Sequence, residues 1–326
     1  MSVIRLRNTH CHLINMMLFL AFTLLLLSDA AASKSIIKSL PGFDGNLPFV
    51  LETGYIGVGE LEAVQLFYYF IESERSPKDD PLVLWLTGGP GCSALSGLIY
   101  EIGPLSFDYA KSSGGGKPVL ALNPYSWTKI ANIIFVDAPV GTGFSYSTTW
   151  EGYHVTDTLS AAETYEFLRK WLVDHPKFLT NPLYVAGDSY TGIVAPIIGT
   201  IKDWRRCNKT LAYSYNVESP VDYHRNLTKQ PYRALIYSGD HDMVIPYVGT
   251  LEWIESLNLT IKYDWEPWFV DGQVAGYAML YADNAQEYIT YDLTVATVKG
   301  GGHTAPEYRP QQCFAMMDRW FDYYPL

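Results

Sequence analysis

The stretch LYVAGDSYTG, residues 183–192, decides the fold of this chain. Its first four residues are typical of a buried strand, Gly187 and Asp188 favour a sharp turn, and the residues that follow are compatible with a helix. A strand, a Gly-x-Ser turn and a helix form a nucleophile elbow, which exposes the serine hydroxyl at the edge of a sheet. The stretch therefore predicts that Ser189 is a nucleophile. Thr191 stands where such elbows usually carry glycine, and a β-branched residue is crowded there.

A serine hydroxyl is a weak nucleophile until a base removes its proton, so a base and an orienting acid are expected further along the chain. Residues 234–237 predict a strand, and the segment SGDHD after it carries Asp240 and Asp242, either of which could orient an imidazole. His303 follows another predicted strand and three glycines, which let a loop bring the histidine over the sheet edge. The order serine, aspartate, histidine predicts a catalytic triad of Ser189 with one of these aspartates and His303.

A glycine-rich loop, Gly88 to Gly91, directly follows the predicted buried strand 82–86. Acyl transfer creates an oxyanion, and backbone N–H groups aimed at that oxygen lower the barrier. We expect one donor from Gly89 in this loop and a second from Tyr190, the residue after the nucleophile. An ordinary Gly-Pro turn is the alternative interpretation of the loop.

The other histidines are poor candidates for the base. The chain has seven histidines, of which His154, His175 and His224 lie in polar contexts and are expected at the surface. His241 stands between two aspartates and is either a decoy or a brace of its loop. No spacing of histidines, cysteines or carboxylates is typical of a metal site, and we expect no metal and no cofactor.

Short apolar runs alternate with helical patterns along the chain. Strands are predicted over 64–70, 82–86, 130–136, 183–186, 234–237 and 293–298. Helices are predicted from Asp157 to about residue 175, from Pro246 to about residue 257, and over 311–323. We expect Asp157 to cap the first of these helices, with an apolar face of Leu159, Ala162, Tyr165, Leu168 and Leu172. The alternation predicts an α/β fold with a mostly parallel central sheet.

Composition and the N-terminus favour a secreted globular protein. Of the 326 residues, 48% are hydrophobic and 17% charged, and the net charge of -11 disfavours nucleic acid and anionic membranes as partners. Two arginines precede the apolar run 16–27, and small residues follow at 30–33. This pattern predicts a signal peptide over residues 1–32 and a single mature domain over 33–326, with an uncleaved membrane anchor as the alternative.

Secretion gives meaning to the cysteines and the asparagine motifs. The mature chain keeps three cysteines, Cys92, Cys207 and Cys313, so one disulfide and one free thiol is the simplest arrangement. Sequons at Asn208, Asn226 and Asn258 predict glycosylation in surface loops.

Taken together, these motifs resemble the serine carboxypeptidase family. The matching segments, in family order over nearly all of the mature chain, are PLVLWLTGGPGC at 81–92, NPYSW at 123–127, DAPVGTGFSY at 137–146, GDSY at 187–190, YSGDHD at 237–242 and GGGHTAP at 300–306. The resemblance implies an α/β-hydrolase fold and a secreted or vacuolar glycoprotein. It also assigns the triad acid to Asp242, and it implies a disulfide between Cys92 and Cys207.

Within that family, the chain is most similar to the plant carboxypeptidase-like acyltransferases. Family peptidases bind the terminal carboxylate of a peptide with an Asn and a Glu at the positions that Thr87 and Asp188 occupy here. The resemblance therefore implies that Ser189 takes an acyl group from a glucose ester and passes it to an acceptor hydroxyl. A serine-type carboxypeptidase is the alternative function, and water in place of the acceptor would make the enzyme an esterase.

The interval between Ser189 and Asp242 is shorter than in the family, whose members carry a further strand and a helical cap there. We therefore predict an internal deletion near Gly199 and Thr200. Strand 234–237 would then pair with strand 183–186 or leave a gap of about 4.8 Å, one strand spacing. Because either outcome could separate the triad, a catalytically impaired truncated form is a further alternative.

Overall fold

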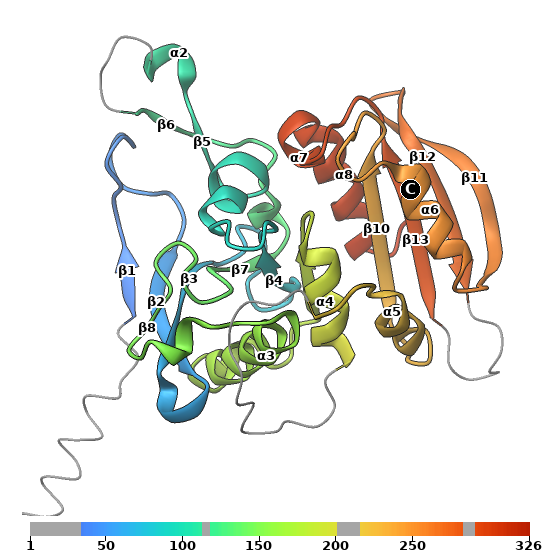
Figure 1. Cartoon of the computed structure of the whole chain (residues 1–326). Coiled ribbons are helices and arrows are strands. Elements are labelled where there is room, and N and C mark those ends of the chain that lie inside the picture. Colours follow the sequence, from blue (N-terminus) through green and yellow to red (C-terminus); the bar gives the residue numbers. More distant parts are fainter. Residues whose placement is uncertain (1–33, 113–117, 201–215, 283–290) are drawn as a thin grey trace, which may run out of the picture. The chain divides into compact units, whose positions relative to one another are not determined.

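The segments that carry the predicted triad lie in two β-sheets of a computed structural model (Figure 1). The model describes residues 34–112, 118–200, 216–282 and 291–326. No strand pairing joins the two sheets within these residues. The predicted signal peptide, Cys207 and Asn208 lie outside the described residues. The predicted deletion junction near Gly199 and Thr200 lies at the end of one described stretch.

The first sheet has the order β1-β2-β3-β7-β4-β9, with β8 paired to β3. Its strands are β1 (Ser35–Ile37), β2 (Leu51–Val58), β3 (Val64–Ile71), β4 (Leu82–Leu86), β7 (Asn132–Val136), β8 (Tyr146–Ser147) and β9 (Leu183–Gly187). The neighbours β7, β4 and β9 are parallel, and the pairs on the other side of β7 are antiparallel. Every residue of β4 and β7 is buried, which explains their continuous apolar sequences.

The second sheet has the order β10-β13-β12-β11. Its strands are β10 (Arg233–Gly239), β11 (Thr260–Val270), β12 (Gln273–Ala282) and β13 (Asp292–Val298). Strands β10 and β13 are parallel, whereas β11 and β12 form an antiparallel hairpin. The α/β class is as predicted, but the sheets are mixed rather than mostly parallel. Among the described pairs of the two sheets, β7 with β4, β4 with β9 and β10 with β13 are parallel and the others are antiparallel. The β11–β12 hairpin and strand β2 were not predicted. A further small hairpin joins β5 (Leu105–Phe107) to β6 (Leu120–Leu122).

Helices pack against both sheets (Figure 1). The α-helices are α2 (Tyr109–Ser112), α3 (Asp157–Asp174), α4 (Thr191–Thr200), α5 (Val221–Leu227), α6 (Tyr247–Glu255), α7 (Ala305–Tyr308) and α8 (Pro310–Phe321). Single turns of other helix types lie at Glu60–Glu62, Gly97–Glu101, Trp127–Lys129, Glu151–Tyr153 and Pro176–Phe178. Helix α3 packs against α4 and β2, and α6 packs against β10. None of the described helices is long and apolar enough to cross a membrane.

Helix α3 has the predicted length but not the predicted cap or face. The hydroxyl of Thr156, not the carboxylate of Asp157, accepts the capping hydrogen bond from the N–H of Leu159. The buried stripe is rotated from the expected one and includes small polar residues, because α3 lies close to α4 and the glycine-rich loop; its members are Asp157, Ser160, Ala161, Glu163, Thr164, Phe167, Leu168 and Trp171.

One hydrophobic core extends under both sheets. It contains buried residues from β3, β4 and β7 of the first sheet and from β11, β12 and β13 of the second, together with the buried face of α8. On α8, the rings of Trp320 and Phe321 lie 5.4 and 4.9 Å from the ring of Tyr184 in β9. The guanidinium of Arg233 in β10 lies over the Trp320 ring and donates a hydrogen bond to its carbonyl oxygen. Helix α8 therefore connects the edge strands β9 and β10 through side-chain contacts.

Of the two predicted outcomes of the deletion, a gap between β9 and β10 is observed in the described chain and a direct pairing is not. Among the described strands, β9 pairs with β4 alone and β10 pairs with β13 alone. The residues of β9 are partly or fully exposed, with Leu183 at 46%, although its neighbour β4 is completely buried. Within the described residues, both strands thus lie at the edge of their sheets, and an open strand edge favours association with other strands.

We expect Leu183→Lys to reduce self-association of this protein, because a lysine on an edge strand opposes pairing with another chain. The concentration at half-association, measured by sedimentation velocity, should rise about tenfold, equivalent to about 1.4 kcal/mol. Leu179→Lys is the matched control, since Leu179 is 62% exposed and lies outside the sheet. An equal effect of both substitutions would mean that charge alone, and not the open edge, controls association.

Candidate active site

Ser189 lies in the tight turn between β9 and α4, with a φ of 49°. A positive φ is uncommon for a residue with a side chain and stores strain, as expected at a nucleophile elbow. The turn is possible because Gly187 lacks a side chain. A Cβ at Gly187 would lie 2.2 Å from the carbonyl oxygen of Leu86 and 2.5 Å from Cγ2 of Thr191.

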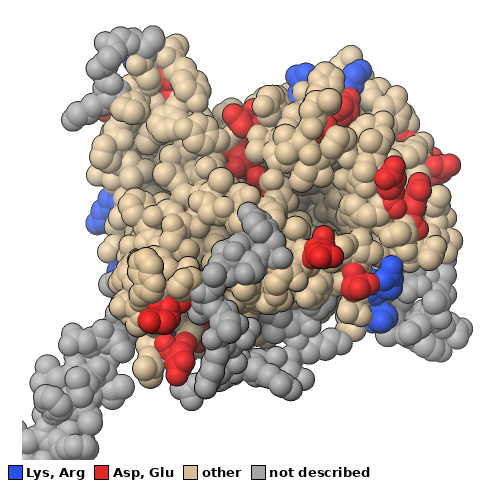
Figure 2. All heavy atoms as spheres, in the orientation of Figure 1, with Lys and Arg blue, Asp and Glu red and all other residues tan. Residues whose placement is uncertain are grey.

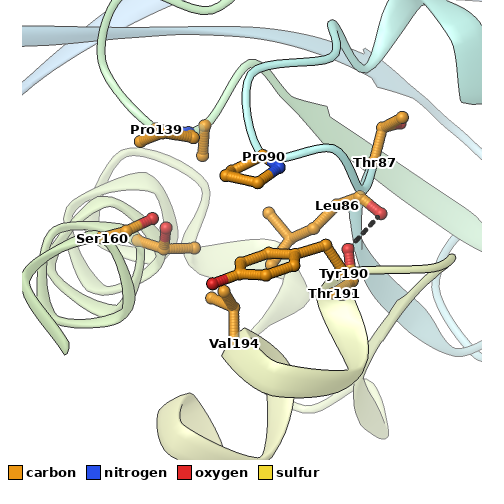
Figure 3. A pocket seen from close by; sticks show the side chains of 10 residues that line it. Leu86, Thr87, Pro90, Pro139, Ser160, Tyr190, Thr191 and Val194 are labelled. Carbon is orange, nitrogen blue, oxygen red and sulfur yellow. Dashed lines mark hydrogen bonds between the residues drawn. The ribbon is translucent and has the colours of Figure 1, made fainter. Parts of the chain in front are cut away.

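The structure explains why Thr191 is tolerated at the position where an elbow usually has glycine. Its side chain is 4% exposed and occupies the space that the missing Cβ of Gly187 leaves open. Its hydroxyl donates a 3.0 Å hydrogen bond to the carbonyl oxygen of Leu86 in β4 (Figure 3). Thr191 is therefore not crowded, and its hydrogen bond connects the start of α4 to β4.

The structure brings Ser189, Asp242 and His303 together. The Nε2 atom of His303 lies 2.8 Å from Oγ of Ser189, and its Nδ1 atom lies 2.9 Å from Oδ2 of Asp242. Asp242 is buried, and its Oδ1 accepts hydrogen bonds from the N–H groups of Val244 and Ile245. Burial opposes ionisation of Asp242, but the hydrogen bonds from His303 and the backbone outweigh it and lower the pKa of the carboxyl. An ionised acid, an imidazole and a hydroxyl in this order are the groups that activate a serine.

The second aspartate and the remaining histidines have other environments. Asp240 accepts a 2.6 Å hydrogen bond from the N–H of Gly300 and so braces the loop before His303. The side chain of His241 is 75% exposed. The surface prediction for His175 was wrong: this residue is buried, stacks on Trp171 and bonds to the carboxylate of Glu52. A burial of this kind has no local sequence signal, because the acid lies in β2.

The glycine-rich loop lies directly against the elbow. A Cβ at Gly88 would lie 2.7 Å from Cβ of Ser189 and 2.8 Å from the backbone nitrogen of Tyr190. Gly89 has a φ of 124° and precedes a cis peptide bond to Pro90. Gly89 and Tyr190, the two expected oxyanion donors, therefore lie on either side of the close contact between loop and elbow. Their role as donors stays a prediction.

Asp137, which the sequence analysis did not single out, fixes the far side of this loop. It follows β7 and is fully buried. Its Oδ1 accepts hydrogen bonds of 2.7 Å from the Ser93 hydroxyl and 2.8 Å from the Ala94 N–H, while Oδ2 accepts one from the N–H of Phe144. The sequence signal that could have found Asp137 is its position directly after a buried strand. Asp242 likewise stands just after a strand.

Thr87 and Asp188, the two predicted substrate-binding residues, lie beside the loop. The Thr87 hydroxyl is buried and has no hydrogen-bond partner among the described residues. The carboxylate of Asp188 accepts a 3.0 Å hydrogen bond from the N–H of Gly88. Burial raises the pKa of Asp188, although this hydrogen bond acts in the opposite direction.

Glu101 is a further acidic group at the site that sequence reasoning missed. Its side chain is 5% exposed, and its Oε2 atom has no hydrogen-bond partner among the described residues. Burial and the nearby charge of Asp188 raise the pKa of Glu101 to about 8. The site therefore places the half-buried carboxyl group of Asp188 near the buried carboxyl group of Glu101, and the pKa of each is raised.

The remaining predicted residues are only partly within the described chain. Cys92 is exposed and Cys313 is buried, and both are free thiols among the described residues. The pairing of Cys92 with Cys207 stays a prediction, because Cys207 lies outside them. Asn226 and Asn258 are exposed as glycosylation requires, although Asn226 lies in α5 rather than in a loop. The described residues contain no cluster of His, Cys, Asp or Glu that could hold a metal ion.

The family model and the most similar curated proteins point to the same family. The family model described as serine carboxypeptidase matches residues 41–201 and 197–323. Serine carboxypeptidase-like 13 of Arabidopsis thaliana is 37% identical over 432 aligned positions, which cover 94% of this chain and 98% of that protein. Serine carboxypeptidase-like 7 of the same plant is 36% identical over 442 positions, covering 96% and 99%. The alignments are longer than this chain of 326 residues, so these relatives contain residues without a counterpart here.

A solved structure shows the same fold. The prohormone-processing carboxypeptidase Kex1 of Saccharomyces cerevisiae superposes with a TM-score of 0.66 over 84% of this chain and 91% of that chain. Its sequence is 14% identical, so the likeness is one of fold alone. The chain thus has the α/β-hydrolase fold that its motifs predict.

We expect Gly88→Ala to abolish reaction of Ser189 with a fluorophosphonate probe, because the new methyl group would displace the elbow or the loop. Overpacking of this kind also costs about 1–3 kcal/mol of stability. The matched control is Gly249→Ala in α6, where a Cβ meets no atom within 4 Å. That substitution should keep full labelling and raise stability by about 0.5–1 kcal/mol. Normal labelling of the Gly88 variant would contradict the close contact.

We expect the stability of the protein to fall as the pH rises from about 4.5 to about 8, in part because of Glu101. Its pKa lies above the usual value of 4.5, so between these pH values the folded chain holds a proton that the unfolded chain releases. Glu101→Gln should flatten this decline in chemical unfolding curves, by an amount on the order of a few kcal/mol. Glu252→Gln, on the exposed side of α6, should leave the slope unchanged. An unchanged slope in the Glu101 variant would show that this carboxyl ionises normally.

Proposed function

This chain belongs to the serine carboxypeptidase family, and from that premise we propose that it is an acyltransferase that moves an acyl group from a glucose ester to an acceptor hydroxyl through an acyl-serine. The observation that carries the proposal is the hydrogen-bonded chain from Ser189 through His303 to Asp242. The acid and base belong to one sheet and the nucleophile to the other, yet all three meet at hydrogen-bond distance.

The proposed reaction has two symmetrical halves. His303 takes the proton of Ser189 as Oγ forms a bond to the ester carbon, and the N–H groups of Gly89 and Tyr190 stabilise the resulting oxyanion. The bond to glucose then breaks, and glucose leaves with the proton that His303 returns. In the second half the acceptor hydroxyl gives its proton to His303 and attacks the acyl carbon. The bond from that carbon to Oγ of Ser189 then breaks, and His303 returns the proton to Oγ. Water as the acceptor would give hydrolysis instead.

The electrostatics of the site support an uncharged ester over a peptide terminus. A terminal carboxylate bound next to Asp188 would meet one carboxyl group directly and the buried Glu101 behind it. Neighbouring like charges disfavour ionisation, so such a substrate needs Asp188 protonated. A neutral glucose ester has no such requirement. Thr87 and Asp188 stand where family peptidases carry Asn and Glu, and both residues occur at these positions in the acyltransferase group that the sequence resembles.

The same comparisons motivate the proposed internal deletion. The two stretches matched by the family model overlap at residues 197–201, and α4 ends at Thr200 within this overlap. We place the junction near Gly199 and Thr200, in the mature domain 33–326. The predicted leader over 1–32 places the protein in the secretory pathway, either outside the cell or in the vacuole. Scattered acidic side chains are more evident than basic ones on the face shown in Figure 2, and the net charge is -11. Both observations support small-molecule partners rather than nucleic acid or an anionic membrane.

The rival interpretation is an inactive truncated form, which the separation of β9 from β10 favours. A fluorophosphonate probe decides between them, because it reacts only with an activated serine. We expect the wild type to be labelled and Ser189→Ala to be unlabelled. Ser256→Ala, at an exposed position after α6, is the matched control and should label normally. A folded wild type without labelling would identify the inactive form.

The class of reaction is tested with a panel of glucose esters and acceptor alcohols at neutral pH. We expect acyl transfer to an acceptor to exceed hydrolysis, and Ser189→Ala to lower the transfer rate by at least about a thousandfold. Blocked dipeptides serve as the comparison substrate. Release of C-terminal residues from them, without transfer from any ester, would instead establish a serine carboxypeptidase.

A further inference from the structure

We propose that Asp157 is a positioning residue for the reaction at Ser189, which holds the side chain of Tyr190 and thereby sets the direction of the Tyr190 backbone N–H. The inference rests on the proposed function, in which this N–H stabilises the oxyanion. Asp157 lies at the start of α3, far from the triad in sequence.

The carboxylate of Asp157 is fully buried and has partners on both oxygens. Its Oδ1 accepts a 2.5 Å hydrogen bond from the hydroxyl of Tyr190. Its Oδ2 accepts hydrogen bonds from the backbone N–H groups of Asn216 at 2.9 Å and Val217 at 3.3 Å. Hydrogen bonds to a buried charged acceptor are short and roughly twice as strong as neutral ones, so this carboxylate is a firm anchor.

The capping hydrogen bond of α3 is made by a different residue. Thr156 accepts the capping bond from the N–H of Leu159, so the Asp157 carboxylate is available for contacts outside its own helix. The carboxylate accepts hydrogen bonds from residues beyond α3, namely Tyr190, Asn216 and Val217. A residue that only stabilised the helix would not require this arrangement.

Tyr190 is held at both ends. Its backbone follows the strained Ser189 and lies against the glycine-rich loop, since a Cβ at Gly88 would be 2.8 Å from the Tyr190 nitrogen. Its ring extends toward Asp157 and Ser160 of α3, between Pro90 and Val194 (Figure 3). Fixing the hydroxyl at the far end of a rigid ring limits rotation of the whole residue. A misplacement of about 1 Å at a reacting group can lower a rate about a hundredfold.

The second oxygen of Asp157 links this anchor to the other half of the site. Asn216 and Val217 lie between α4 and β10, on the part of the chain that leads to Asp242. One carboxylate therefore contacts both the elbow that carries Ser189 and the segment that leads to the triad acid. This contact joins the two halves in a region where no backbone pairing connects β9 to β10.

Tyr190→Phe tests the anchor because it removes the hydroxyl and keeps the ring. With a p-nitrophenyl ester we expect kcat and the rate of fluorophosphonate labelling to fall about tenfold, while KM changes less than twofold. The midpoint of thermal unfolding should fall by only a few degrees. Tyr291→Phe is the matched control, because the Tyr291 hydroxyl is buried without a hydrogen-bond partner in the described chain. Unchanged kcat and labelling in the Tyr190 variant would overturn the inference.

Asp157→Asn, alone and combined with Tyr190→Phe, tests whether the aspartate acts through the tyrosine. We expect the double variant to label no more slowly than Asp157→Asn alone, because both changes break the same link. Asp174→Asn, at the exposed end of α3, is the control and should label at the wild-type rate. Effects that multiply in the double variant would overturn the inference while leaving the proposed function intact.

The failure of the proposed function has a different signature. A folded wild type that is not labelled would overturn that function, and with it the catalytic role of the anchor. The link itself is then judged from the unfolding free energies of the same four proteins. Additive effects on stability would show that Asp157 and Tyr190 are not coupled at all.

Discussion

The imidazole of His303 connects two β-sheets that share no strand pairing in the described chain, and the whole candidate site depends on this connection. Ser189 follows β9 at the edge of one sheet, whereas Asp242 and His303 follow β10 and β13 of the other. In a continuous sheet, backbone hydrogen bonds would set the distance between these strand ends. Here the distance is set by side chains: the shared core, the rings of α8 and the hydrogen bonds of the triad.

Side-chain packing can replace a backbone ladder because the core is continuous. Buried residues of β4 and β13 belong to one cluster with α8, so separating the sheets would expose apolar surface on both. Arg233 and Tyr184, one from each edge strand, both contact Trp320. What the packing does not restore is the pairing of the two inner strand edges, and β9 is therefore much more exposed than a strand next to β4 would be in a closed sheet.

Much of the site could be predicted from local sequence, and the errors have a common cause. The elbow, the strand ends before Asp242 and His303, and the loop at Gly88 are all signalled by short motifs, because turns and strand ends depend on neighbouring residues. The cap of α3 was placed one residue late, and its buried face was rotated, because contacts with α4 and the glycine-rich loop decide which side of α3 is covered. The burial of His175 and the place of Glu101 at the site were missed because the groups beside them come from distant parts of the sequence, namely Glu52 and Asp188.

The sequence by itself determined the α/β class, the strands and turns around the site, the candidate residues Ser189 and His303 with two possible aspartates, and the family. These features follow from residue type and short-range spacing, which act through local backbone geometry. Only the tertiary structure decided that β10 stands apart from β9, that Asp242 rather than Asp240 contacts His303 in space, and that Asp157 contacts Tyr190 instead of capping its helix. These choices depend on which surfaces are buried against each other, and burial is a property of the whole packed chain.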